Sequence, residues 1–217
     1  MNLSYLSINY YDLNLPMRQG SKIRGYFANK YPESILVHNH KNEKSMYRYP
    51  LIQYKIIDGI PVILGLNEGS KELIDMGILF ESSIDIDGTE YNLDRTEIIS
   101  KEIYFGTTDK ILKYQFKTPW MALNAKNSEI YKNSDEIDRE ELLKRVLIGN
   151  IISMSKSLGY TIEEKLKVKI NLKEVPVKFK NQNMVGFRGE FYINFDIPQY
   201  LGIGRNVSRG FGTVVKV

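Results

Sequence analysis

The chain has 217 residues, 42% of them hydrophobic, so it can bury a core in one large domain or two small ones. Its formal net charge of +4 is a mild basic excess, compatible with an acidic partner. Cysteine is absent, which excludes disulfides, zinc ribbons and thiol chemistry. The sequence has neither a signal-peptide pattern at its start nor an apolar run near the ~20 residues of a membrane helix, so it predicts a soluble cytoplasmic protein.

The elements predicted for the first half follow in the order strand, helix, strand, strand, helix, strand. Alternating apolar residues predict the strands, and apolar residues at helical spacing predict the helices. The expected strands are residues 3–8, 51–57, 60–66 and 80–91, and the expected helices are residues 16–30 and 68–79. Asp58-Gly59 and Asp87-Gly88 are hairpin turn signals. This order is that of the ferredoxin-like split unit.

The second half predicts a looser version of the same unit. A long amphipathic helix is expected at residues 135–158, with Ser134 as its cap and acidic residues in its first turn. Strands are expected at residues 97–105, 110–117, 166–172, 175–179, 184–195 and at the end of the chain. We therefore predict an α+β fold of two tandem ferredoxin-like (RRM-like) domains with antiparallel sheets, formed by residues 1–92 and 93–217.

A glycine-rich segment near the end of the chain reads Gly202-Ile-Gly-Arg-Asn-Val-Ser-Arg-Gly-Phe-Gly212. Glycine lets another backbone approach closely, and the two arginines suit contact with phosphates. A Walker loop would place a lysine and a hydroxyl residue after Gly210, where Phe211 stands, and would continue into a helix. A dinucleotide fingerprint would need glycine in place of Val207. The segment predicts contact with a phosphate backbone, and a plain hairpin turn is the alternative.

The only two histidines, His38 and His40, are separated by one residue. On extended backbone their rings would project to the same side. Because imidazole titrates near neutral pH, one ring can accept a proton while the other donates one, which suits RNA cleavage through the ribose 2′-hydroxyl without a metal. Tyr47 is a candidate for orienting that hydroxyl. Two alternatives stay open, a His-x-His metal site completed by Asp or Glu and two solvated loop histidines without a role.

Basic residues near these two motifs are the candidates for RNA contact. Those near the histidines are Lys41, Lys44 and Arg48, the last as a stabiliser of the charged intermediate. Those of the glycine-rich segment and the strand before it are Gly202, Gly204, Arg205, Arg209, Gly210, Gly212 and Arg188. A patch on the first helix is a weaker candidate because charged helix faces are usually only solvated: Arg18, Lys22 and Arg24.

The terminal glycine motif, the histidine pair and the tandem ferredoxin-like order together resemble the CRISPR-associated repeat-RNA processing endoribonucleases. These form the sixth Cas family of the repeat-associated mysterious protein (RAMP) superfamily, and the resemblance is to its b-type. It implies cleavage of CRISPR repeat RNA into guide RNAs without metal or cofactor, leaving a 2′,3′-cyclic phosphate and a 5′-hydroxyl, with His38, His40 and Tyr47 as catalytic residues. It also implies dimerisation and transfer of the product to an interference complex.

Two other functions stay open at this point. The glycine motif alone would suit a non-catalytic RNA-binding RAMP subunit of a CRISPR effector complex. A ferredoxin-like structural or small-molecule protein with a glycine hairpin is the alternative from another class.

Overall fold

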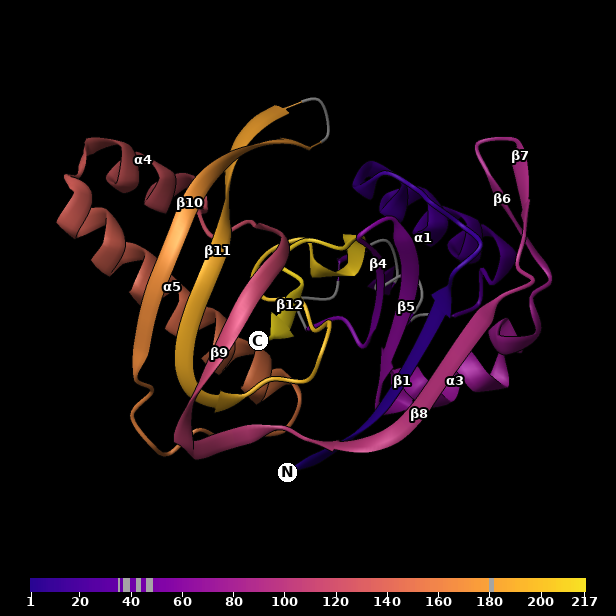
Figure 1. The fold of residues 1–217 in the computed structure, drawn as a ribbon, viewed down its shortest axis with the longest axis horizontal. Coiled ribbons are helices and arrows are strands. Elements are labelled where there is room, and N and C mark those ends of the chain that lie inside the picture. Colours follow the sequence, from indigo (N-terminus) through magenta and orange to yellow (C-terminus); the bar gives the residue numbers. More distant parts are fainter. Residues whose placement is uncertain (35, 37–39, 42–43, 46–48, 180–181) are drawn as a thin grey trace. The chain divides into compact units, whose positions relative to one another are not determined.

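The computed structural model describes residues 1–34, 36, 40–41, 44–45, 49–179 and 182–217, with the backbone alone at 40–41 and 44–45. The chain divides into two compact units (Figure 1). The first unit comprises Asn2–Ile103 and Val207–Gly210, and the second comprises Met1, Tyr104–Asn206 and Phe211–Val217. Each unit is built on a four-stranded sheet, which confirms the predicted α+β fold of two ferredoxin-like domains.

The sheet of the first unit has the strand order β4-β5-β1-β8. Its strands are β1 (Asn2–Tyr10), β4 (Ile52–Ile57), β5 (Ile60–Leu66) and β8 (Thr96–Tyr104). The turn between β4 and β5 has positive φ at both Asp58 (50°) and Gly59 (89°), as the Asp-Gly signal predicts. Hydrogen bonds from Asn9 Nδ2 to Glu97 and from Ser4 Oγ to Glu102 show that β8 runs antiparallel to β1.

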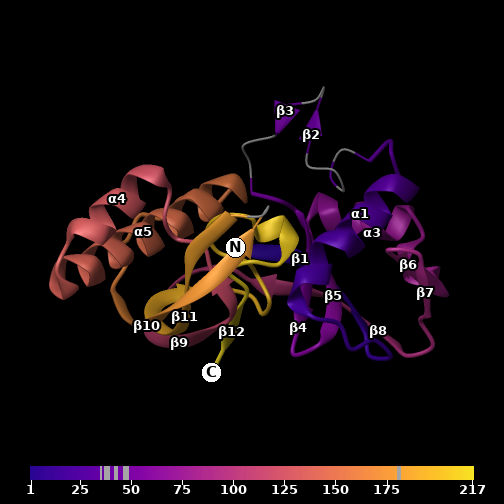
Figure 2. The same cartoon turned by 90° about the horizontal axis from the view of Figure 1, so that it is seen from above.

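Helices α1 (Gly20–Lys30) and α3 (Glu68–Asp75) cover one face of this sheet (Figure 2). A short 3-10 turn, η1 (Met17–Gln19), precedes α1 and starts after Pro16. The core between helices and sheet is apolar and includes the stacked rings of Phe27 and Tyr54, whose centroids lie 6.0 Å apart. The predictions made from periodic apolar residues are therefore confirmed for β1, α1, β4, β5 and α3.

The predicted fourth strand, residues 80–91, is wrong. After the 3-10 turn η2 (Ile78–Phe80), strands β6 (Ser83–Ile86) and β7 (Thr89–Asn92) pair with each other in a separate two-stranded sheet. The turn at Asp87-Gly88 folds the segment back on itself, so its hydrogen bonds are used within the hairpin. β8 takes the open edge beside β1. The compact units therefore change over at Ile103–Tyr104, not near residue 93.

The sheet of the second unit repeats the same order, β10-β11-β9-β12. Its strands are β9 (Gly106–Trp120), β10 (Val168–Phe179), β11 (Gln182–Asp196) and β12 (Val214–Lys216). The two strands expected at residues 166–172 and 175–179 are one strand, β10. Between β11 and β12, where a ferredoxin-like unit has its second helix, the chain instead contains the glycine-rich segment with the 3-10 turn η3 (Val207–Arg209).

Helices α4 (Ala125–Asn133) and α5 (Glu136–Ser157) cover one face of the second sheet (Figure 1). The sequence analysis missed α4, although Asn124 before it is a cap signal, and its side chain accepts a hydrogen bond from the Asn127 amide. The cap of α5 is Asp135, not Ser134, because Asp135 Oδ1 accepts from the Asp138 amide at 2.9 Å. Within the described part of the chain, every helix is too short or too polar to span a bilayer.

Candidate RNA interface

The histidine segment forms a short hairpin in the part that the structure describes. β2 (His40–Lys41) pairs antiparallel with β3 (Lys44–Ser45), with His40 opposite Ser45 and Lys41 opposite Lys44. The backbone is thus extended at His40, which is the conformation that the histidine hypothesis requires there. His38, Tyr47 and Arg48 lie outside the described residues. The side chains of Lys41 and Lys44 also lie outside the described part of the structure.

Gly204 and Gly210 of the glycine-rich segment lie tightly against neighbouring strands. Gly204 has φ of +90°, and a Cβ there would lie 2.6 Å from Nε1 of Trp120. That indole donates to Asn150 Oδ1 at 3.1 Å, so it is held in place between sheet and helix. Gly210 has φ of +89°, and a Cβ there would lie 3.0 Å from the Tyr54 carbonyl oxygen. The absence of a side chain at both glycines therefore lets the segment pack closely against the rest of the protein.

The other two glycines predicted to bind RNA are also packed inside the protein. Gly202 is buried and forms an isolated bridge with Thr213. A Cβ on Gly212 would collide with the carbonyl oxygen of Ile203. In this segment it is the arginines that present charged groups, and RNA contact by the glycines themselves stays a prediction.

The two arginines of the segment belong to different units. Arg205 is in the second unit, where it is exposed and donates from Nη1 to the Leu123 carbonyl at 3.0 Å. Arg209 is in the first unit, because Val207–Gly210 packs on β4 and α1. Arg188 and Arg205 are therefore described with the second unit, and Arg209 is described with the first.

Arg209 is close to Arg24 of α1. A Cβ on Gly20, one turn before Arg24, would lie 3.6 Å from the carbonyl oxygen of Arg209. Burial, in the first place, and the positive charge of Arg209, in the second, lower the pKa of Arg24, while Tyr54 opposes the shift. Both arginines are half-buried. Arg24 and Arg209 therefore place two positive charges near each other in a partly buried part of the first unit.

The remaining cations of the first-helix patch differ in their surroundings. Lys22 forms an exposed ion pair with Asp87 at 2.9 Å. Arg18 is exposed in η1. Arg24, which the sequence analysis placed in its weaker group, thus has the most specific environment of the three. Only its neighbour in the folded protein, Arg209, distinguishes Arg24 from the other two residues.

Lys55 of β4 lies directly beneath the glycine-rich segment. A Cβ on Gly210 would lie 3.2 Å from its Cα. The side chain has no exposed surface, and in the described part of the protein no hydrogen-bond partner reaches its Nζ. Burial lowers the pKa of Lys55 to about 7.

The comparisons with known proteins cover the whole chain. The family model of the Cas6b N-terminal domain matches residues 1–104, and that of the Cas6b C-terminal domain matches residues 106–217. A crystal structure of Cas6b is 69% identical, with a TM-score of 0.98, and a crystal structure of the CRISPR RNA processing endoribonuclease Cas6b is 67% identical, with a TM-score of 0.82. Both similarities cover 100% of each chain.

A curated relative is similar over part of the chain. The uncharacterized protein MJ0978 of Methanocaldococcus jannaschii is 53% identical over 114 residues, which are 52% of this chain and 78% of that protein. The two domain models and the similarity over the whole chain agree with the tandem ferredoxin-like architecture. This chain therefore belongs to the Cas6b family.

Proposed function

We propose that this Cas6b protein cleaves CRISPR repeat RNA by metal-independent general acid–base catalysis. The observation that carries the activity is the 67% identity, over both full chains, to a protein named as a CRISPR RNA processing endoribonuclease. The chain is accordingly an endoribonuclease of this family. The chemistry of the cut is supported by the histidine pair and by the basic groups of the first unit.

The proposed reaction uses the ribose next to the scissile phosphate as the nucleophile. One imidazole of His38 and His40 removes the proton of the 2′-hydroxyl, and the 2′-oxygen attacks phosphorus. The bond from phosphorus to the 5′-oxygen breaks, and the other imidazole, protonated, gives its proton to that oxygen. The products carry a 2′,3′-cyclic phosphate and a 5′-hydroxyl. Tyr47 is proposed to orient the 2′-hydroxyl.

The paired arginines supply the electrostatic part of this proposal. Arg24 and Arg209 offer planar guanidinium groups that match phosphate oxygens. Burial and, second to it, the positive charge of Arg209 lower the pKa of Arg24, and a bound phosphate offsets both effects. We assign them to the RNA backbone, together with Lys41, Lys44 and Arg48. Dimerisation, transfer of the guide RNA to an interference complex and cytoplasmic location belong to the same proposal.

The test is cleavage of a repeat RNA by purified protein in EDTA. Wild type is expected to cut, and the double variant His38→Ala/His40→Ala is expected to bind the RNA and leave it intact. A substrate with a single 2′-deoxyribose at the cut should resist wild type, because the nucleophile is missing. Cleavage of that deoxy substrate, or full dependence on added metal, would contradict the proposed chemistry. RNA that is shifted in electrophoresis and never cut would identify a non-catalytic binding subunit.

A further inference from the structure

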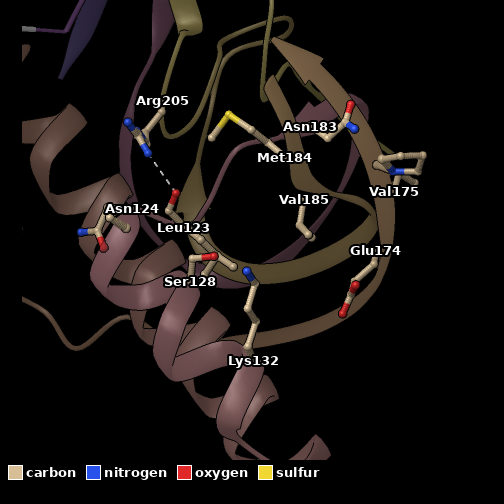
Figure 3. Close-up of a pocket in the computed structure, with 12 residues that line it drawn as sticks. Leu123, Asn124, Ser128, Lys132, Glu174, Val175, Asn183, Met184, Val185 and Arg205 are labelled. Carbon is tan, nitrogen blue, oxygen red and sulfur yellow. Dashed lines mark hydrogen bonds between the residues drawn. The ribbon is translucent and has the colours of Figure 1, made fainter. Parts of the chain in front are cut away.

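A pocket in the second unit lies away from the histidine segment in the chain and has no role in the proposed reaction. Its volume is about 690 Å³, within the ~300–1,000 Å³ typical of small-molecule sites. It is formed by one side of α4 and the residues just before it, the adjoining parts of β10 and β11, and Arg205 of the glycine-rich segment (Figure 3). The volume is sufficient for one nucleotide unit.

The walls of the pocket are mainly apolar. β10 and β11 contribute Val175, Pro176, Met184 and Val185, and Leu123 closes the pocket beside α4. A nucleobase taken out of a stack needs such surfaces for its faces, and a thioether adapts well to a flat ring. Amides and a hydroxyl stand among these apolar groups and can bind the base edge or sugar: Asn124, Ser128 and Asn183.

Three charged residues of the described part of the chain line the pocket, Arg205, Lys132 and Glu174. Arg205 is held by its hydrogen bond to the Leu123 carbonyl, and Lys132 reaches toward the pocket from α4 (Figure 3). Glu174 stands across from Arg205, and its Oε1 accepts a hydrogen bond from the Tyr131 hydroxyl at 2.7 Å. A phosphate therefore finds two cations on the side of α4 and Arg205, and repulsion on the side of Glu174.

We infer that this pocket binds one unpaired nucleotide of the RNA substrate, with its base against the apolar residues of β10 and β11 and its phosphate near Arg205 and Lys132. The inference rests on the proposed function for the identity of the RNA. It adds a recognition site in the second unit that takes a nucleotide outside the bond that is cut. The planar guanidinium of Arg205 is held by one hydrogen bond, and its remaining N–H groups and its face can contact the phosphate and the base.

The first experiment maps the pocket with small probes on the full-length protein. Methyl NMR follows Val175, Met184 and Val185 during titration with 5′-CMP and with cytidine. We expect these methyl signals to shift, and 5′-CMP to bind more tightly than cytidine because only the nucleotide has a phosphate. A single-stranded RNA that shifts the same signals and displaces 5′-CMP identifies RNA as the source of the nucleotide. Signals that move with an apolar peptide and stay fixed with 5′-CMP would overturn the inference.

The second experiment compares two lysines of the same helix. Lys132→Ala removes the charge that lines the pocket, whereas Lys126→Ala removes an exposed charge of α4 that does not line it. We expect Lys132→Ala to lose the advantage of 5′-CMP over cytidine. It should also weaken binding of repeat RNA about three- to tenfold and reduce the slope of log affinity against log salt by about 0.7–0.9. Lys126→Ala should do neither, and equal effects of the two variants would contradict the inference.

The third variant changes shape without changing charge. Val185→Phe narrows the pocket and is expected to abolish the 5′-CMP shifts and weaken RNA binding. If wild type fails to cut RNA while the pocket still binds nucleotides, the proposed reaction is wrong and this inference stands. If wild type cuts RNA and both Val185→Phe and Lys132→Ala bind it as wild type does, the pocket inference alone is wrong.

Discussion

Arg24, near the beginning of the chain, has its pKa lowered first by burial and second by the positive charge of Arg209, near the end of the chain. The contact exists because Val207–Gly210 packs on the first unit although its neighbours on both sides belong to the second. Gly210 permits that approach, since a Cβ there would press on the backbone of β4. The glycine motif thus lets the backbone of Arg209 lie close to α1.

The first prediction concerns this arginine pair. Arg24→Gln and Arg209→Gln should each weaken repeat-RNA binding about tenfold, the size expected for loss of a charge-assisted hydrogen bond of about 1.5 kcal/mol. The salt slope should fall by about one in each. Arg18→Gln, an exposed arginine just before the same helix, should change affinity much less. The measurement is a binding titration at several salt concentrations.

A thermal measurement tests the same pair without RNA. Inorganic phosphate should raise the Tm of wild type more than chloride does at equal ionic strength, because an oxyanion relieves the repulsion between Arg24 and Arg209. Arg24→Gln and Arg209→Gln should each lose the additional rise in Tm that phosphate gives to wild type. A gain that persists in both variants would show that the anion binds elsewhere.

The second prediction concerns Gly204. Gly204→Ala should destabilise the protein by about 1–3 kcal/mol, because it combines positive φ with a Cβ 2.6 Å from Trp120 Nε1. Gly149→Ala is the matched control, since it lies inside α5 with open space at its Cβ position. That change should be neutral or stabilise the helix by up to about 1 kcal/mol. Urea unfolding measures both, and equal free energies for the two variants would contradict the packing argument.

The third prediction is a pH dependence that belongs to Lys55. Its folded-state pKa of about 7 is below its ordinary value, so between these two values the unfolded state binds more protons than the folded state. Stability from this group therefore rises with pH above about 7, and at lower pH the full cost of burying the charge remains. Lys55→Met should be more stable than wild type at pH 6, by an amount on the order of a few kcal/mol.

That advantage of Lys55→Met should shrink steadily as the pH is raised from 7 toward 10. Free energies of unfolding from urea titrations across this range give the comparison, and subtracting wild type from variant removes the titration of all other groups. A difference that stays constant with pH would mean that Lys55 does not titrate as its burial requires.

The fourth prediction separates two neighbouring candidates for the cap of α5. Asp135→Ala should cost about 1 kcal/mol of stability, because Asp135 accepts the hydrogen bond of the Asp138 amide and its charge suits the helix N-terminus. Ser134→Ala should change stability by less than about 0.5 kcal/mol, since the Ser134 hydroxyl donates to the Ile130 carbonyl at an exposed place. Thermal unfolding of both variants is the check, and the reverse order would restore Ser134 as the cap.

The errors of the sequence analysis have a common physical cause. Most side chains of β8 are exposed, so no apolar alternation in the sequence indicates that this strand belongs to the first sheet. Because α4 was not predicted, Lys132 and Ser128 were not candidates for ligand contact. Strong periodicity succeeded where a face is buried, as in β4, β5 and α5.

The sequence by itself determined the family, through the spacing of the glycines and the paired histidines, and it determined the two repeated ferredoxin-like units. These are local properties, since a positive φ needs glycine and a buried face needs periodic apolar residues. Only the tertiary structure decided that Arg209 joins Arg24 while Arg205 joins a pocket of the second unit. Two arginines in one short segment have the same local pattern, and their surroundings differ because distant strands and helices supply the neighbours.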